Sequence, residues 1–239
     1  MEINNLLLTG LKIYQDSESF KFSIDSLLLA DFVELKPKDK VLEFGSGNGA
    51  ILLYLSQKFP NQMLGIELIP EMVTLSNKSL ELNHLEKRIT FKELDIKKAH
   101  LVLGANRYDC VISNPPYFKK GRGLVNDALN KTNARHEQTI TFKEIVSEAK
   151  KVLVDGGRFY FIHRAEWISE IIKVLADNNF GLFSLRNVYP KKTSDSALLL
   201  LVEARLNRNS ETKILKPLYI YDGEEYSEEI KAIYKLRKG

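Results

Sequence analysis

The sequence predicts an α/β domain built around a sheet of seven strands, with a small N-terminal extension. From residue 40 onward, short apolar runs alternate with helical patterns, which is the order of elements in a parallel sheet. A glycine-rich loop, Gly45–Gly49, follows the first of these runs. The chain has 239 residues, 44% of them hydrophobic, and this is enough for one large core with additions.

Residues 1–36 are expected to form a hairpin and a short helix. Apolar residues alternate with polar ones in 11–14 and 20–22, on either side of a polar segment, and this pattern favours a hairpin. Asp25 is the expected cap of a helix over Ser26–Leu35. That helix should end ahead of Pro37, because the residue before a proline is pushed out of helical geometry.

Residues 37–210 are expected to supply all seven strands and the helices between them. Pro70 favours a helix start, because proline at the first helical position gives up no hydrogen bond. A polar segment, Phe118–Thr139, is long enough to be a functional loop, and we expect a mobile lid there. The expected strands are Val41–Phe44, Met63–Glu67, Ile89–Glu93, Tyr108–Ser113, Arg158–Ile162, Phe183–Val188 and Ala197–Glu203, and the other helices Ala50–Phe59, Phe142–Leu153 and Glu166–Ala176.

Residues 211–239 are expected to be a folded tail packed on the core. An extended segment, Leu218–Tyr221, precedes a short charged helix that begins at Ser227.

Composition excludes several classes of protein and leaves others open. The chain has no apolar run long enough to span a bilayer and no secretory signal at its start, so we expect a soluble, cytoplasmic protein. The single cysteine, Cys110, excludes an internal disulfide and a cysteine-rich metal site; no metal is expected. A net charge of +4 permits a nucleic-acid partner without requiring one. The oligomeric state is left open, with a monomer favoured.

The glycine-rich loop is typical of a nucleotide-like ligand in a Rossmann-like fold. Gly45, Gly47 and Gly49 let the backbone approach a ligand, and the next helix presents free amide groups to it. Glu67 ends the next strand, where its carboxylate can accept hydrogen bonds from both ribose hydroxyls. The same glycine spacing also fits a dinucleotide, and a tight turn without any ligand is the remaining alternative.

Two further positions favour S-adenosylmethionine over a dinucleotide. Asp95 ends the third strand segment, where its carboxylate can accept a hydrogen bond from the adenine amine, although it can instead cap a helix over residues 96–98. Asn114-Pro115-Pro116-Tyr117 ends the fourth strand beside the expected sulfonium. Its amide oxygen and backbone carbonyl are neighbouring acceptors, stiffened by two proline rings and flanked by an aromatic face. This arrangement suits a planar amine, and a rigid turn is the alternative.

These motifs resemble those of class I S-adenosylmethionine-dependent methyltransferases that modify exocyclic amines. The resemblance implies that Glu67 holds the ribose of the cofactor and Asp95 its adenine. It implies that the methionine part of the cofactor is lined by Glu43, Gly45, Gly47 and Gly49. The target base would be held by Asn114, Pro115, Pro116 and Tyr117. Asn114 would also lie against the cofactor. Glu43 departs from the commonest pattern, because many relatives have aspartate there, and a glutamate should still reach.

More narrowly, almost the whole chain is similar to the bacterial tRNA(Val) adenine-N(6) methyltransferases. The additional similar segments are Gln15, residues 20–30, Ala134-Arg135-His136-Glu137, and residues 219–222 and 226–230 of the tail. The implied reaction is methylation of the anticodon-adjacent adenine of tRNA(Val). In it, Asn114 and the Pro115 carbonyl would accept the two amine hydrogens while Tyr117 stacks on a flipped base, and no general base is needed.

Basic residues that follow this motif are expected to hold tRNA phosphates. The expected contacts are Lys119, Lys120, Arg122, Arg135 and His136, with Lys191 and Lys192 as further candidates. A solvated surface is the alternative for each of them.

Three other functions stay open at this stage. A release-factor glutamine methyltransferase uses the same tetrapeptide but carries an N-terminal helical domain. A guanine-N(2) methyltransferase of ribosomal RNA usually has larger additions or a phenylalanine at the position of Tyr117. A non-catalytic, cofactor-sensing RNA-binding module would be free to lose Asn114.

Overall fold

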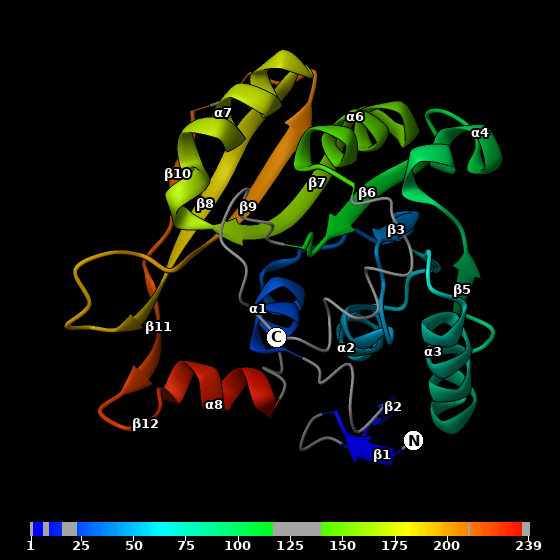
Figure 1. The fold of residues 1–239 in the computed structure, drawn as a ribbon, viewed down its shortest axis with the longest axis horizontal. Helices are drawn as coiled ribbons and strands as arrows, with labels where there is room; N and C mark the ends of the chain where they lie inside the picture. The colour runs from blue at the N-terminus through cyan, green and yellow to red at the C-terminus, as the bar shows by residue number, and fades with distance from the viewer. Residues whose placement is uncertain (1, 7–9, 16–22, 117–139, 210, 236–239) are drawn as a thin grey trace.

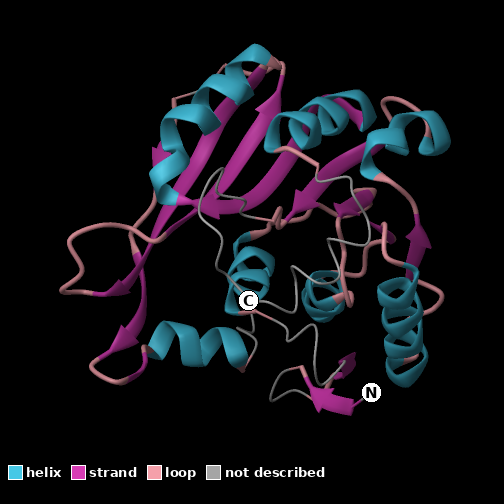
Figure 2. Cartoon of the chain, viewed as in Figure 1, coloured by secondary structure: helices cyan, strands magenta, loops and turns pink. Residues whose placement is uncertain are grey.

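A twisted sheet runs through the molecule, and helices cover both of its faces (Figures 1 and 2). The computed structural model describes residues 2–6, 10–15, 23–116, 140–209 and 211–235. The predicted α/β fold class is confirmed. Within the described residues the sheet has ten strands, and a separate two-stranded sheet lies near the N-terminus.

Seven strands between residues 41 and 206 form the body of the sheet in the order β8-β9-β7-β6-β3-β4-β5. The strands from β7 to β5 are parallel to one another, whereas β9 runs antiparallel between β7 and β8. Their bounds are β3 (Val41–Phe44), β4 (Met63–Glu67), β5 (Ile89–Glu93), β6 (Tyr108–Ser113), β7 (Leu153–Arg164), β8 (Phe180–Lys191) and β9 (Leu199–Leu206).

The tail extends this sheet, so the predicted count of seven strands is wrong for the whole sheet. β10 (Lys213–Ile214) and β11 (Leu218–Asp222) pair with β8, and β12 (Glu225–Tyr226) pairs with β11. β8 leaves one side of its backbone without a partner in the seven-stranded body, and the tail satisfies these groups. The predicted extended segment and the helix after Ser227, α8 (Glu228–Tyr234), are both present.

Residues alternate between two cores, one on each face of the sheet. Leu42, Val111 and Phe159 belong to one core, whereas their neighbours Val41 and Cys110 belong to the other. Helices then cover the two faces: α1 (Ile24–Phe32), α2 (Ala50–Lys58), α3 (Pro70–Asn83) and α8 on one, and α4 (Ala99–Leu103), α6 (Phe142–Val152) and α7 (Ile168–Asp177) on the other. Burial raises the pKa of the Cys110 thiol, which keeps it protonated.

The N-terminal extension differs from the prediction in two details. The hairpin pairs β1 (Glu2–Asn5) with β2 (Lys12–Gln15), while residues 20–22, its predicted second strand, lie outside the described residues. Helix α1 begins after Ser23, with Asp25 inside its first turn, so Asp25 is not the cap. The division of the chain at residues 36 and 210 stays a prediction. No helix in the described part of the chain is long and apolar enough to cross a membrane.

Candidate active site

The predicted site residues follow neighbouring parallel strands, so the fold gathers them along one edge of the sheet. Asn114 comes directly after β6, the glycine loop after β3, Glu67 ends β4 and Asp95 follows β5 by two residues. Since β6, β3, β4 and β5 are neighbours in that order, these groups follow one another along the edge. Ligands of open α/β sheets bind at this carboxyl edge.

The glycine loop has a backbone that only glycine adopts readily. Gly45, Gly47 and Gly49 all have positive φ angles, of 69°, 52° and 85°. A Cβ at Gly49 would lie 2.6 Å from Cζ of Phe91, so this position also needs glycine for packing. A Cβ at Gly47 would meet no atom within 4 Å, which leaves open space above the loop. The loop therefore combines a rigid base with room for a ligand.

Glu67 ties the glycine loop to the end of β4. Its Oε2 accepts a hydrogen bond from the Gly47 amide at 2.9 Å, and its Oε1 accepts from the Leu68 and Ile69 amides at 2.8 and 3.0 Å. A carboxylate has about four acceptor positions, so most of those of Glu67 are already used by the backbone. The ribose contact of Glu67 stays a prediction, and the structure adds a role in shaping the loop.

Asp95 caps a 3₁₀ turn, η1 (Ile96–Lys98), through a hydrogen bond that its Oδ1 accepts from the Lys97 amide at 2.9 Å. The capping alternative is therefore present in the structure. It does not exhaust the carboxylate, because further acceptor positions remain for a ligand amine. The adenine contact of Asp95 stays a prediction.

A small cavity next to the glycine loop contains several buried polar atoms without partners. Glu43 is buried, with 1% of its surface exposed. Its Oε2, the Ser46 Oγ and the Asn48 Nδ2 have no hydrogen-bond partner in the described part of the chain. All three residues line a cavity of about 130 Å³, together with Ser26 and Asn114. Buried polar groups are nearly always paired, so this cluster indicates a ligand with matching polar groups.

Burial raises the pKa of the Glu43 carboxyl well above its usual value, and the negative charge of Glu67 raises it further. A cation in the cavity would act in the opposite direction and favour the ionised form. The cavity is smaller than the ~300–1,000 Å³ of a complete small-molecule site. It therefore suits the ammonium end of a ligand whose remainder lies along the open edge.

Asn114 is held by a residue from the N-terminal helix. The Asn114 side-chain nitrogen, Nδ2, donates a hydrogen bond to Ser26 Oγ in α1 at 3.2 Å. Because the amide is planar, this contact turns the Asn114 oxygen away from Ser26. Ser26 did not stand out as a site residue in the sequence, because the pair is 88 positions apart and no local pattern connects it.

The two prolines that follow differ in exposure: Pro115 is buried and Pro116 is exposed. Ser113, directly before Asn114, donates a hydrogen bond from its Oγ to the Phe44 carbonyl at 3.2 Å and so fixes the end of β6 to β3. The other predicted base and RNA contacts, Tyr117, Lys119, Lys120, Arg122, Arg135 and His136, lie outside the described residues, as does the expected lid over residues 118–139.

Comparison with known protein families gives one match over most of the chain. A family model described as "Methyltransferase domain" matches residues 35–217. Among curated relatives, the chain is 26% identical over 199 residues to a tRNA1(Val) (adenine(37)-N6)-methyltransferase of Flavobacteriaceae bacterium (strain 3519-10), covering 82% of each chain. It is 28% identical over 231 residues to the protein of the same name from Haemophilus influenzae (strain PittGG), covering 95% of this chain and 93% of the relative.

Solved structures share the fold. A predicted O-methyltransferase from Agrobacterium tumefaciens superposes with a TM-score of 0.69 at 23% identity, covering 88% of this chain and 95% of its own. A geranyl diphosphate methyltransferase solved in complex with S-adenosylmethionine gives a TM-score of 0.54 at 13% identity, with 75% and 83% covered. At these identities the likeness extends to the fold alone.

Proposed function

The chain belongs to the methyltransferase domain family, and on that premise we propose that it methylates the exocyclic N6 amine of an adenine in tRNA. It is an S-adenosylmethionine-dependent methyltransferase. The observation that carries the proposal is Asn114, which follows β6 next to the Glu43 cavity with its amide nitrogen held by Ser26. The names of the relatives support the anticodon-adjacent adenine of tRNA(Val) as the target.

The residues of the site fit the proposed cofactor. Bound S-adenosylmethionine supplies an electrophilic methyl group on a sulfonium. Glu43 would accept a hydrogen bond from the ammonium of its methionine part. The Asn48 Nδ2 and the Ser46 Oγ could donate to the carboxylate of the same part, and the orphaned atoms would then be satisfied. Gly45, Gly47 and Gly49 would allow close approach of the backbone. Glu67 would take the ribose hydroxyls and Asp95 the adenine amine.

The acceptor amine is the second requirement of the reaction. The lone pair of the adenine N6 amine is delocalised into the ring, so the site must favour a pyramidal amine. In the proposed mechanism, the Asn114 oxygen and the Pro115 carbonyl accept its two hydrogens and stabilise the positive charge that grows on it during transfer. Pro116 stiffens the turn and Tyr117 stacks on the flipped base. The ammonium proton then leaves to water, so no residue acts as general base.

Lys119, Lys120, Arg122, Arg135 and His136 are proposed to hold tRNA phosphates next to the site, which agrees with the net charge of +4. A tRNA-modifying enzyme of this kind would work in the cytoplasm, and we propose a monomer. A release factor, a ribosomal RNA guanine and a non-catalytic role are less well supported, because the curated relatives given above are all named as tRNA adenine methyltransferases.

The direct test is transfer of label from S-adenosylmethionine to unmodified total tRNA, with ribosomal RNA and release factor in parallel. Nuclease digestion and nucleoside analysis should show labelled N(6)-methyladenosine from tRNA alone. Label in the release factor or in ribosomal RNA would contradict the proposed substrate. Measurable cofactor binding without label in any acceptor would favour a non-catalytic module.

A further inference from the structure

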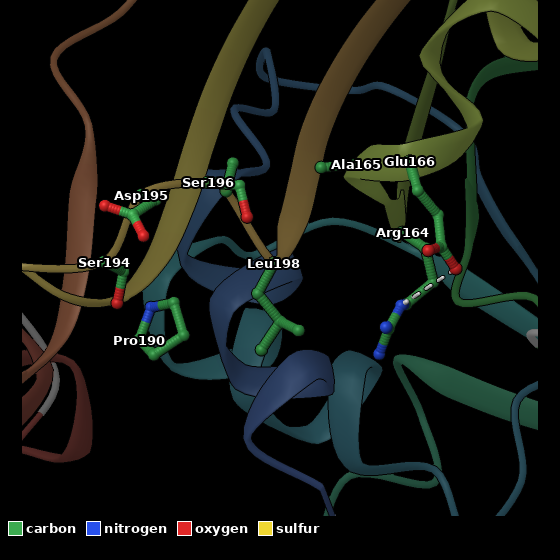
Figure 3. Close-up of a pocket in the computed structure, with 9 residues that line it drawn as sticks. Arg164, Ala165, Glu166, Pro190, Ser194, Asp195, Ser196 and Leu198 are labelled. Atoms are coloured by element: carbon green, nitrogen blue, oxygen red, sulfur yellow. Dashed lines mark ion pairs between the residues drawn. The ribbon is translucent and has the colours of Figure 1, made fainter.

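A second, larger cavity lies at the same edge of the sheet, and Figure 3 shows the residues that line it. In the strand order it lies on the other side of β6, and so of Asn114, from the glycine loop. Its volume is about 610 Å³. Arg164, at the end of β7, lies three residues beyond Phe161, which pairs with Ser113 at the end of β6. Because β7 is the neighbour of β6 on the side away from β3, the cavity flanks the proposed position of the target base.

The cavity is lined by apolar side chains, Pro190 and Leu198 among them, by one cation, Arg164, and by two carboxylates, Glu166 and Asp195. Figure 3 shows Leu198 between Pro190 and Arg164, with Ser194 and Asp195 on the loop that joins β8 to β9. A volume of this size falls within the ~300–1,000 Å³ of sites that bind small ligands. Pro190 and Leu198 can give a base apolar contact, and Arg164 can give a phosphate a cation, so the pair of features suits a nucleotide.

The partner of Arg164 is easily exchanged. Its Nε lies 3.8 Å from Oε1 of Glu166, and the two side chains are 36% and 48% exposed. A charge-assisted hydrogen bond measures ~2.7–2.9 Å, so this pair is long, and exposed pairs of this kind contribute little to stability. A phosphate can offer the guanidinium two hydrogen bonds and can therefore replace Glu166.

We propose that this cavity, the Arg164 groove, binds the nucleotide next to the target adenine in the tRNA strand. Arg164 takes its phosphate, while Pro190 and Leu198 contact its base. This inference rests on the proposed function, and it adds a contact with the tRNA substrate that the proposed function does not include. Lys191 and Lys192 follow Pro190 and are exposed, so they add positive charge near the groove. The Nζ of Lys192 lies 3.8 Å from Oδ2 of Asp222, and Asp195 and Glu166 offset further charge. Among the described residues that line the groove, Arg164 is the only cation.

Two substitutions in the groove should change tRNA affinity in opposite directions. Arg164→Ala should raise the Kd for unmodified tRNA about tenfold and lower the slope of log K against log salt by about one, because one phosphate contact is lost. Glu166→Gln should lower the Kd about two- to threefold, because it removes the carboxylate that competes for Arg164. A role limited to folding would not produce opposite signs.

Arg208→Ala provides a matched control. Arg208 also forms an exposed pair, with its Nη2 at 2.7 Å from Oδ2 of Asp155, but it follows β9 and its partner lies near the start of β7, at the opposite edge of the sheet. The tRNA affinity and salt slope of the Arg208→Ala variant should equal those of the wild type. Fluorescence anisotropy with unmodified tRNA measures all four proteins without depending on catalysis.

The outcomes separate this inference from the proposed function. If the protein methylates tRNA but the Arg164→Ala variant keeps the wild-type Kd and salt slope, the groove does not bind the neighbouring nucleotide, and the proposed function still stands. Opposite shifts in a protein that methylates no tRNA support the groove and contradict the function. Weakened binding of release factor, with tRNA binding unchanged, overturns the assignment of the groove to RNA.

Discussion

At the scale of single residues, Glu43 has an environment that opposes its negative charge. It is buried, one of its oxygens has no partner in the described part of the chain, and Glu67 adds a second negative charge nearby. Such a carboxyl weakens the protein without its ligand and strengthens the binding of a cation. The same residue is therefore expected to link stability, pH and cofactor binding.

Replacement of Glu43 by glutamine should change how stability depends on pH. Folding raises the pKa of this carboxyl, so the folded state binds its proton more tightly than the unfolded state does. The free energy of unfolding therefore falls as the pH rises from about 4.5, the usual pKa of the group, through its higher pKa in the folded state. Glu43→Gln should therefore be more stable than the wild type at pH 8, with a smaller difference at pH 4. Denaturant titrations of both proteins without cofactor measure this, and calorimetry should show weaker S-adenosylmethionine binding. If the stability of the two proteins changed with pH in the same way, Glu43 would not be the carboxyl whose pKa the fold raises.

Ser26 gives a second prediction at this scale. Its hydroxyl holds the Asn114 nitrogen at 3.2 Å and thereby sets which amide atom faces the acceptor. Ser26→Ala should lower kcat about tenfold, equivalent to about 1.4 kcal/mol, and change the KM for S-adenosylmethionine much less, although Ser26 also lines the Glu43 cavity. Ser26→Thr retains the hydroxyl and should restore most of the rate. Equal rates for the alanine variant and the wild type would show that Asn114 needs no such support.

At the scale of elements, the glycine loop contacts three neighbouring strands, β3, β4 and β5, and leads into helix α2. It leaves β3, is bound by Glu67 at the end of β4, and starts α2 at Ala50. Phe91 of β5 packs so closely under it that neither Gly49 nor Gly65 has room for a Cβ. The conformation of the loop is thus imposed by its neighbours as well as by its own glycines.

Gly49→Ala should destabilise the fold by about 2–4 kcal/mol, which adds the strain of a positive φ to overpacking against Phe91. Gly223→Ala is the matched control, because Gly223 also has a positive φ, of 67°, but a Cβ there meets no atom within 4 Å. It should cost only about 1–2 kcal/mol. Urea denaturation of the two variants checks the difference. Equal losses would mean that Phe91 moves aside at little cost.

At the scale of the whole molecule, the body of the sheet could be predicted from the sequence because each of its strands is an apolar run between turn signals. The glycine loop, Glu67 and Asp95 could likewise be placed at one edge, because the carboxyl ends of parallel strands meet there. β10 and β12 have two residues each, too few for a pattern, and they form only because β8 offers its edge to β10 and β11 offers its own to β12. The Arg164 groove joins the end of β7 and the residues after it with the end of β8 and the β8–β9 loop, and no local signal connects these segments.

The central claim is that Asn114 acts on the acceptor amine, and single-turnover methyl transfer by Asn114→Ala tests it most directly. The rate of methyl transfer to unmodified tRNA should fall at least about a hundredfold, which is the size expected for loss of a charge-stabilising acceptor. Calorimetry with S-adenosylmethionine serves as the control for folding. It should give a Kd for the cofactor within about threefold of the wild type. Normal cofactor binding together with a near-normal rate would contradict the account.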